Sequence, residues 1–171
     1  MRFEFEPKLT DDLREQIVTL WWEVSNAGGA VGFVPPVTRA EVWSIAGKAF
    51  ASIDAGIDHL LVGFDGDRPV AMLIFVSRQF HLSEHWRTVA RVMVSPDSQG
   101  RGFGGELMRE GERVARVMGW EGLYLTVRDG HRVERFYGSI GYREVGRLPG
   151  TLRLAPGDDR DEILMWLPLK A

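Results

Sequence analysis

The chain of 171 residues contains no cysteine and only four histidines. The absence of cysteine excludes disulfides, thiolate metal sites and a cysteine nucleophile, and it fits a reducing compartment. Runs of like charge are also missing, because 21 basic and 24 acidic residues are mixed along the chain and give a net charge of −3. This balance argues against nucleic acid or an acidic membrane surface as a partner, so we expect a small-molecule partner.

Long apolar runs are missing as well. No stretch approaches the ~20 apolar residues that span a bilayer, and the first twelve residues, MRFEFEPKLTDD, lack the apolar core of a signal peptide. We therefore expect a cytoplasmic protein that needs neither a membrane nor a metal. With 44% hydrophobic residues, the length predicts a single domain over residues 1–171.

Hydrophobic periodicity predicts an α/β fold. A strand is expected over residues 2–7, followed by two helices that begin after Thr10 and Thr38 and end near Asn26 and Gly56. Three strands then follow in succession, which indicates an antiparallel meander and not a doubly wound sheet. The expected strands of the meander are HLLVGF, PVAMLIFVSRQF and WRTVARVMV; later come a helix, the strand GWEGLYLTV, a short helix over residues 133–140, and the strands YREVGRLP and DEILMWLPL.

The segment between the first two helices is rich in glycine and proline. NAGGAVGFVPPV, residues 26–37, contains three glycines and two prolines, so its backbone can adopt unusual dihedrals and approach a ligand closely. It is a candidate substrate loop. A plain connection between two helices is the alternative.

A second glycine-rich stretch, VSPDSQGRGFGGELM at residues 94–108, carries two overlapping motifs. The G-x-G-x-x-G motif that begins at Gly100 matches a dinucleotide fingerprint, but five residues, including Pro96, separate it from the strand end at Val94. The Q-x-x-G-x-G motif that begins at Gln99 instead predicts a loop whose backbone N–H groups wrap a pyrophosphate at a helix N-terminus.

Two stretches resemble one family. VMVSPDSQGRGFGGELM resembles the acyl-CoA-binding motif of the GNAT N-acetyltransferase superfamily, and LYLTVRDGHRVERFYGSIGYREVG resembles the second half of that fold. The resemblance implies a mixed, mostly antiparallel seven-stranded sheet flanked by about four helices, with acetyl-CoA as co-substrate where the fourth strand splays from the fifth. It implies acetyl-CoA contacts from Met93, Val94, Gln99, Gly100, Arg101, Gly102, Phe103 and Gly104.

Three features resemble the tabtoxin-resistance branch of this superfamily: NAGGAVGFVPP, LPGTLRLAPGDDRDEILMWLPL and Gly130. This resemblance implies acetyl transfer to the amino group of a small amino-acid-like toxin or antibiotic, and it is compatible with a homodimer. The candidate substrate loop, however, supplies glycine N–H groups and Asn26 but no charge. The alternative is therefore a more apolar amine, packed by some of four aromatic side chains: Trp21, Trp22, Phe33 and Trp43.

Direct attack of an amine on a thioester requires that the ammonium lose a proton and that the departing thiolate gain one. The resemblance assigns the second role to Tyr137, for which an aromatic core cluster is the alternative. Thr88 and Thr126 stand where the family often carries acids, and a threonine is no base at neutral pH. The base is left open between water and five side chains: His81, Glu84, His85, Asp129 and His131.

Two other functions compete with an acetyltransferase. If no base exists, the same fold serves as a non-catalytic acyl-CoA-binding sensor. A dinucleotide-dependent oxidoreductase is the second rival, and the strand order argues against it.

Overall fold

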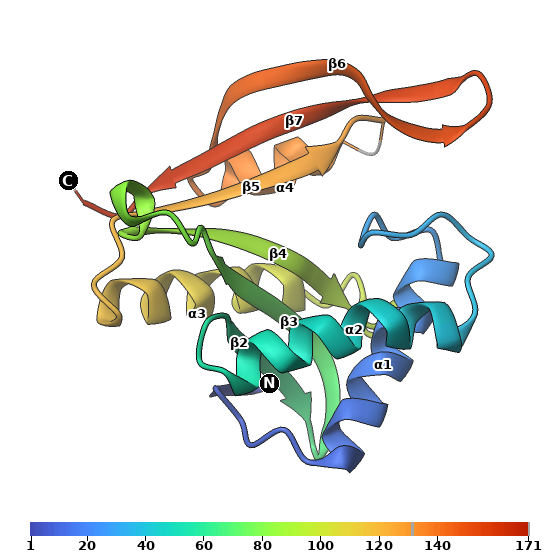
Figure 1. Cartoon of the computed structure of the whole chain (residues 1–171), viewed down its shortest axis with the longest axis vertical. Helices are drawn as coiled ribbons and strands as arrows, with labels where there is room; N and C mark the ends of the chain where they lie inside the picture. Colours follow the sequence, from blue (N-terminus) through green and yellow to red (C-terminus); the bar gives the residue numbers. More distant parts are fainter. Residues whose placement is uncertain (131, 171) are drawn as a thin grey trace. The chain divides into compact units, whose positions relative to one another are not determined.

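A computed structural model describes residues 1–130 and 132–170. Its sheet has the strand order β1-β2-β3-β4-β5-β7-β6, with a parallel β4–β5 pair and antiparallel β1–β2, β2–β3, β5–β7 and β6–β7 pairs. The predicted mixed, mostly antiparallel seven-stranded fold is confirmed. The elements are β1 (Arg2–Phe5), α1 (Asp11–Asn26), α2 (Arg39–Asp54), β2 (His59–Asp65), β3 (Arg68–Ser77), β4 (Trp86–Val94), α3 (Phe103–Val117), β5 (Gly122–Arg128), α4 (Val133–Ser139), β6 (Arg143–Ala155) and β7 (Asp158–Pro168) (Figure 1).

The chain divides into two compact units. The first comprises Met1–Ser77 and Val89–Val114, and the second comprises Arg78–Thr88 and Ala115–Ala171. The expectation of a single domain over the whole chain stays a prediction.

Helices α1 and α2 of the first unit begin at the caps that the sequence predicts. The Thr10 hydroxyl accepts the N–H of Leu13, and Thr38 forms a capping box with Glu41. Each cap satisfies a backbone N–H that the helix itself leaves without an acceptor. None of the described helices is both long enough and apolar enough to cross a membrane.

Strands β2 and β3 of the first unit are buried on both faces. Leu60, Val62 and Met72 belong to a core cluster with α1 and α2. On the other face, Leu73 and Leu61 pack against α3, where a Cβ at Gly111 would lie 3.0 Å from Leu73 Cδ2. This double coverage explains why β2 and β3 are continuous apolar runs and not alternating ones.

Strands β5, β6 and β7 form most of the second unit together with α4 (Figure 1). Trp86, at the start of β4, stacks on Trp166 of β7 with ring centroids 5.7 Å apart. A Cβ at Gly122 would lie 3.0 Å from the Trp86 ring, so this glycine makes room for the stack. The parallel β4–β5 register pairs Trp86–Thr88 with Gly122–Tyr124.

The last two strands are longer than the sequence predicts. The pattern YREVGRLP ends at Pro149, whereas β6 continues to Ala155. Three register shifts interrupt its pairing with β7, and most of its side chains are exposed. A strand that is bulged and solvated shows no steady alternation of apolar and polar residues, which is why its second half was missed.

Candidate functional site

A polar cluster fixes the chain between β4 and the glycine-rich loop. Asp97 accepts hydrogen bonds from the hydroxyls of Ser95 at 2.6 Å and Ser98 at 3.1 Å, and from the Arg68 guanidinium at 2.7 Å. Arg68 also donates to the Ser95 hydroxyl, and the Ser95 N–H donates to the carbonyl of Val70 in β3. These hydrogen bonds therefore fix the position of the chain where the loop leaves the end of β4.

The electrostatics of Asp97 follow from these donors. Hydrogen bonds from Ser95 and Arg68 stabilise the carboxylate and lower the pKa of Asp97 to about 2. Ser95 and Ser98 are buried, and their hydroxyls are satisfied by the same carboxylate. Sequence reasoning missed this cluster, although Ser-Pro-Asp-Ser is the kind of sequence that forms such local side-chain turns.

The predicted pyrophosphate loop continues from this cluster. Gly100 and Gly102 have φ angles of +74° and +84°, and a Cβ at either position would meet nothing within 4 Å. The Gln99 amide donates back to the carbonyl of Val94 at 3.1 Å. The first bond of α3 runs from the Glu106 N–H to the Gly102 carbonyl, so the preceding N–H groups have no acceptor within the helix. An open surface lined with backbone donors is compatible with a diphosphate.

Arg101 lies beside this loop. Its guanidinium stacks over the Phe103 ring at 4.6 Å and approaches Asp65 to 3.6 Å. Both of these charged side chains are more than half exposed, so their ion pair is weak. Arg101 can exchange this contact for an incoming anion at little cost.

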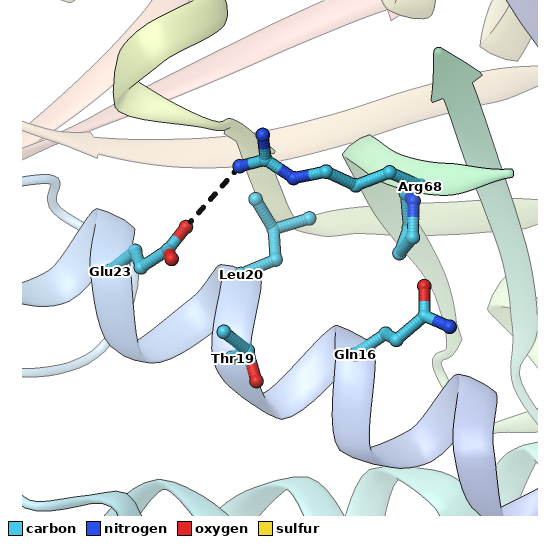
Figure 2. Close-up of a pocket in the computed structure, with 6 residues that line it drawn as sticks. Gln16, Thr19, Leu20, Glu23 and Arg68 are labelled. Carbon is cyan, nitrogen blue, oxygen red and sulfur yellow. Dashed lines mark ion pairs between the residues drawn. The ribbon is translucent and has the colours of Figure 1, made fainter. Parts of the chain in front are cut away.

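A hollow of about 260 Å³ lies in the first unit between α1 and the start of β3. Figure 2 shows Arg68 extending toward Glu23, to which its guanidinium is 3.7 Å away. Arg68 is therefore neutralised by Glu23 as well as by Asp97. On the α1 side, the hollow is lined by the polar residues Gln16 and Thr19.

Residues 27–37, called the substrate loop below, are held by side chains of α1. Asn26 donates to the Val37 carbonyl and accepts from the Val37 N–H, both at 3.0 Å. The indole N–H groups of Trp22 and Trp21 donate to the carbonyls of Val37 and Val31. Asn26, Trp22 and Trp21, which sequence reasoning offered to a substrate, are thus engaged with the loop itself, and Trp21 is fully buried in the core. Trp43 instead packs edge-on against Phe50 of α2.

Arg91 of β4 brings a positive charge to the substrate loop, and sequence reasoning missed it. Its Nη1 donates to the Val31 carbonyl at 3.0 Å, and its guanidinium carbon lies 5.0 Å from the centroid of the Trp21 ring. A Cβ at Gly32 would lie 2.3 Å from Nη1, so only glycine lets the loop pass this close. The single charge within the apolar run VARVMV was the signal that could have revealed it.

Tyr137 is a buried residue of α4 in the second unit. Its ring makes edge contacts with Phe136 and Tyr142 at centroid distances of 5.1 and 5.6 Å. Burial raises the pKa of the Tyr137 phenol, which therefore stays protonated in neutral solution. Phe136, the preceding residue, is only half-buried, whereas Tyr137 is buried.

The candidate bases lie in varied surroundings. His81, Glu84 and His85 are exposed, whereas Asp129 accepts the Gly130 N–H and lies 3.5 Å from Arg147. His131 lies outside the described residues. Over residues 1–130 and 132–170, no three histidine or acidic side chains are grouped closely enough to hold a metal.

Comparison with known proteins gives the family. Three solved N-acetyltransferase structures share the fold: ribosomal-protein-alanine N-acetyltransferase from Brucella melitensis (TM-score 0.79, 16% identity, covering 98% of this chain and 99% of that one), an N-acetyltransferase from Staphylococcus aureus (0.78, 13%, 99% and 100%), and a chimera of the Vibrio cholerae spermidine N-acetyltransferase SpeG with hSSAT (0.76, 15%, 99% and 96%). The sequence model of the acetyltransferase (GNAT) family matches residues 14–142, which is most of the chain. The chain therefore belongs to the acetyltransferase (GNAT) family and is an N-acetyltransferase.

Proposed function

We propose that the protein transfers the acetyl group of acetyl-CoA to the primary amine of a small molecule. The observation that carries this proposal is the glycine-rich loop at residues 99–104, which follows the hydrogen-bonded end of β4 and leads into α3 with backbone N–H groups that have no acceptor within that helix. Acetyl-CoA supplies an acetyl thioester that an amine can attack. The protein has to hold the two reactants and move two protons.

Among the proposed contacts with acetyl-CoA, those to its phosphates have the most structural support. The N–H groups of residues 99–104 and the N-terminal end of α3 would face the diphosphate, with Arg101 as an additional cation. Backbone groups of Met93 and Val94 would bind the pantetheine amides in the manner of an added strand. An N–H near Val94 would also stabilise the developing oxyanion.

Tyr137 is the proposed general acid. A tyrosine phenol carries its proton at neutral pH, and the departing thiolate needs one. The amine would lose its own proton to water or to one of the exposed candidates, His81, Glu84 or His85.

The proposed acceptor is a small amino-acid-like molecule, as in the tabtoxin-resistance branch that the substrate loop resembles. Its glycines give close access to the backbone, and α1 holds the loop in place through Asn26 and Trp22. We propose that the protein acts in the cytoplasm, where acetyl-CoA is available and where proteins rarely depend on disulfides. A homodimer is compatible with this proposal.

The proposal is tested by thermal melts followed by a turnover screen. At a hundredfold excess over the dissociation constant, a ligand adds ~2.7 kcal/mol of stability, so acetyl-CoA and CoA should raise the melting temperature by a few degrees and NAD should not. A thiol-release screen over amino acids, aminoglycosides and polyamines then seeks the acceptor. A shift with NAD alone contradicts the proposal; binding of acetyl-CoA without turnover of any amine favours the non-catalytic sensor.

A further inference from the structure

A half-buried cation without an acidic partner faces the substrate loop. No carboxylate of the described residues lies within ion-pair distance of the Arg91 guanidinium, whereas Arg68 has both Glu23 and Asp97. Burial lowers the pKa of Arg91, and no acidic neighbour counteracts it. An arginine nevertheless stays charged in a protein, so the fold retains a partly desolvated positive charge here.

The surroundings of the guanidinium orient it but do not saturate it. Nη1 shares the Val31 carbonyl with the indole N–H of Trp21, and the Trp21 ring packs on the guanidinium. These contacts use one of its five N–H donors. Arg91 as a whole is half-buried and not fully enclosed. Gly32 passes close beside the guanidinium, at a position where any side chain would clash with it.

The backbone at Arg91 is strained in a way that supports a specific role. Its φ angle is +53°, the left-handed region that residues with a side chain rarely adopt within a strand. Such an irregularity re-aims a side chain relative to its neighbours along the strand. Strain of this kind is found where the position of a side chain matters more than the local backbone energy.

We propose that Arg91, together with the N–H of Gly32, forms a subsite that binds a carboxylate carried by the acceptor amine; the N–H groups of Gly28 and Gly29 are already bonded to carbonyls of α1. This inference rests on the proposed function, which places the acetyl group near Met93 and Val94. At about 3.3 Å per residue along a strand, Arg91 is about 7 Å from Met93, within the span of a small molecule. A guanidinium binds a carboxylate through two parallel hydrogen bonds. The subsite selects amino-acid-like acceptors and disfavours simple amines and polyamines.

The test compares amines that differ only in the carboxylate. Alanine and ethylamine, phenylalanine and phenethylamine, and lysine and cadaverine are titrated into the protein by calorimetry in the presence of CoA. The variants are R91M, which removes the charge, R91K, which keeps it without the planar fork, and R113M as the control. Arg113 is an exposed arginine of α3 that pairs with Glu110. If R91M does not fold, R91K serves alone.

The wild type and R113M should bind the carboxylated member of at least one pair about 10- to 100-fold more tightly, the range expected of charge-assisted hydrogen bonds. R91M should lose this preference while keeping its affinity for the simple amine, and R91K should keep part of it. The proposal is overturned if the wild type shows no preference in any pair, or if the arginine variants retain it in full.

Turnover separates this inference from the proposed function. If carboxylate binding depends on Arg91 and no amine is acetylated, the proposed function fails and the subsite stands. If both members of every pair are acetylated with equal kcat/KM and R91M changes neither value, the function stands and the subsite fails.

Discussion

The Arg68 guanidinium lies 2.7 Å from a carboxylate oxygen of Asp97, and this ion pair joins the start of β3 to the chain that leads into the glycine-rich loop. The same carboxylate accepts two serine hydroxyls. The position of the loop therefore depends on one charged group whose protonation can be controlled.

Acid should remove the contribution of Asp97 to stability. Its pKa falls from the ordinary 3.8 to about 2 in the folded protein, so its stabilising effect is complete above about pH 5 and is lost as the pH falls toward about 2. The wild type should melt at a higher temperature than D97N near neutral pH, and the difference should shrink between about pH 4 and pH 2. Melts of D67N, altered in the exposed β2–β3 turn, provide the control. A difference that stays constant down to pH 2 contradicts this role.

Substitution of Gly102 by alanine should weaken acetyl-CoA binding. A left-handed residue with a side chain costs about 1–2 kcal/mol, and no atom lies within 4 Å of the added Cβ, so the strain falls on the loop backbone. Relief of that strain would rotate the N–H groups of the loop, and the affinity for acetyl-CoA should fall about tenfold or more.

Gly66 offers a matched control for Gly102. It also has a positive φ, +61°, with open space at its Cβ position, and it lies in the β2–β3 turn. G66A and G102A should lose similar stability in thermal melts, whereas calorimetry with acetyl-CoA should find G66A unchanged. Equal losses of affinity in the two variants would show that the loop has no special role.

Tyr137→Phe should lower kcat by about 100-fold or more, the usual worth of a general acid, and leave the dissociation constant of acetyl-CoA unchanged. Because burial raises the pKa of Tyr137, the wild type should also show no alkaline loss of kcat from ionisation of this phenol in the ordinary assay range. Tyr142→Phe, in the neighbouring ring, is the control. A Y137F variant that is as fast as the wild type at every pH assigns Tyr137 to the core instead.

Asn26→Ala should raise KM for the amine more than KM for acetyl-CoA. It removes two hydrogen bonds to Val37, each worth about 1 kcal/mol, and so releases the end of the substrate loop. Asn26→Asp keeps the acceptor for the Val37 N–H but loses the donor, so its effect should be intermediate. Steady-state kinetics with both substrates varied distinguish this result from a general loss of stability, which would lower kcat alone.

The fold was largely predictable because its signals are local. Thr10 and Thr38 cap the helices as expected, and the apolar runs of β2 and β3 are legible because both faces are buried. The second half of β6 could not be predicted, since its bulges and solvated side chains give no regular alternation of apolar and polar residues. Local propensity and burial can be inferred from the residues of one segment, whereas register shifts depend on the pairing with a partner strand.

The candidate site was predictable only where one continuous segment forms it. The loop at residues 99–104 is such a segment. The role of Arg91 could not be predicted in this way, because its contacts with Val31 and Gly32 join positions about sixty residues apart. They also depend on a left-handed backbone conformation at Arg91, which an arginine in the sequence does not indicate. The pairing of Arg68 with Asp97 is also non-local, since it joins positions 29 residues apart.

The most direct test of the central claim is the mass of an amine after incubation with acetyl-CoA and the protein. We predict that at least one small primary amine gains one acetyl group on nitrogen while an equal amount of CoA is released, and that G102A slows both together. Tight binding of acetyl-CoA with no acetylated product from any amine would contradict the account.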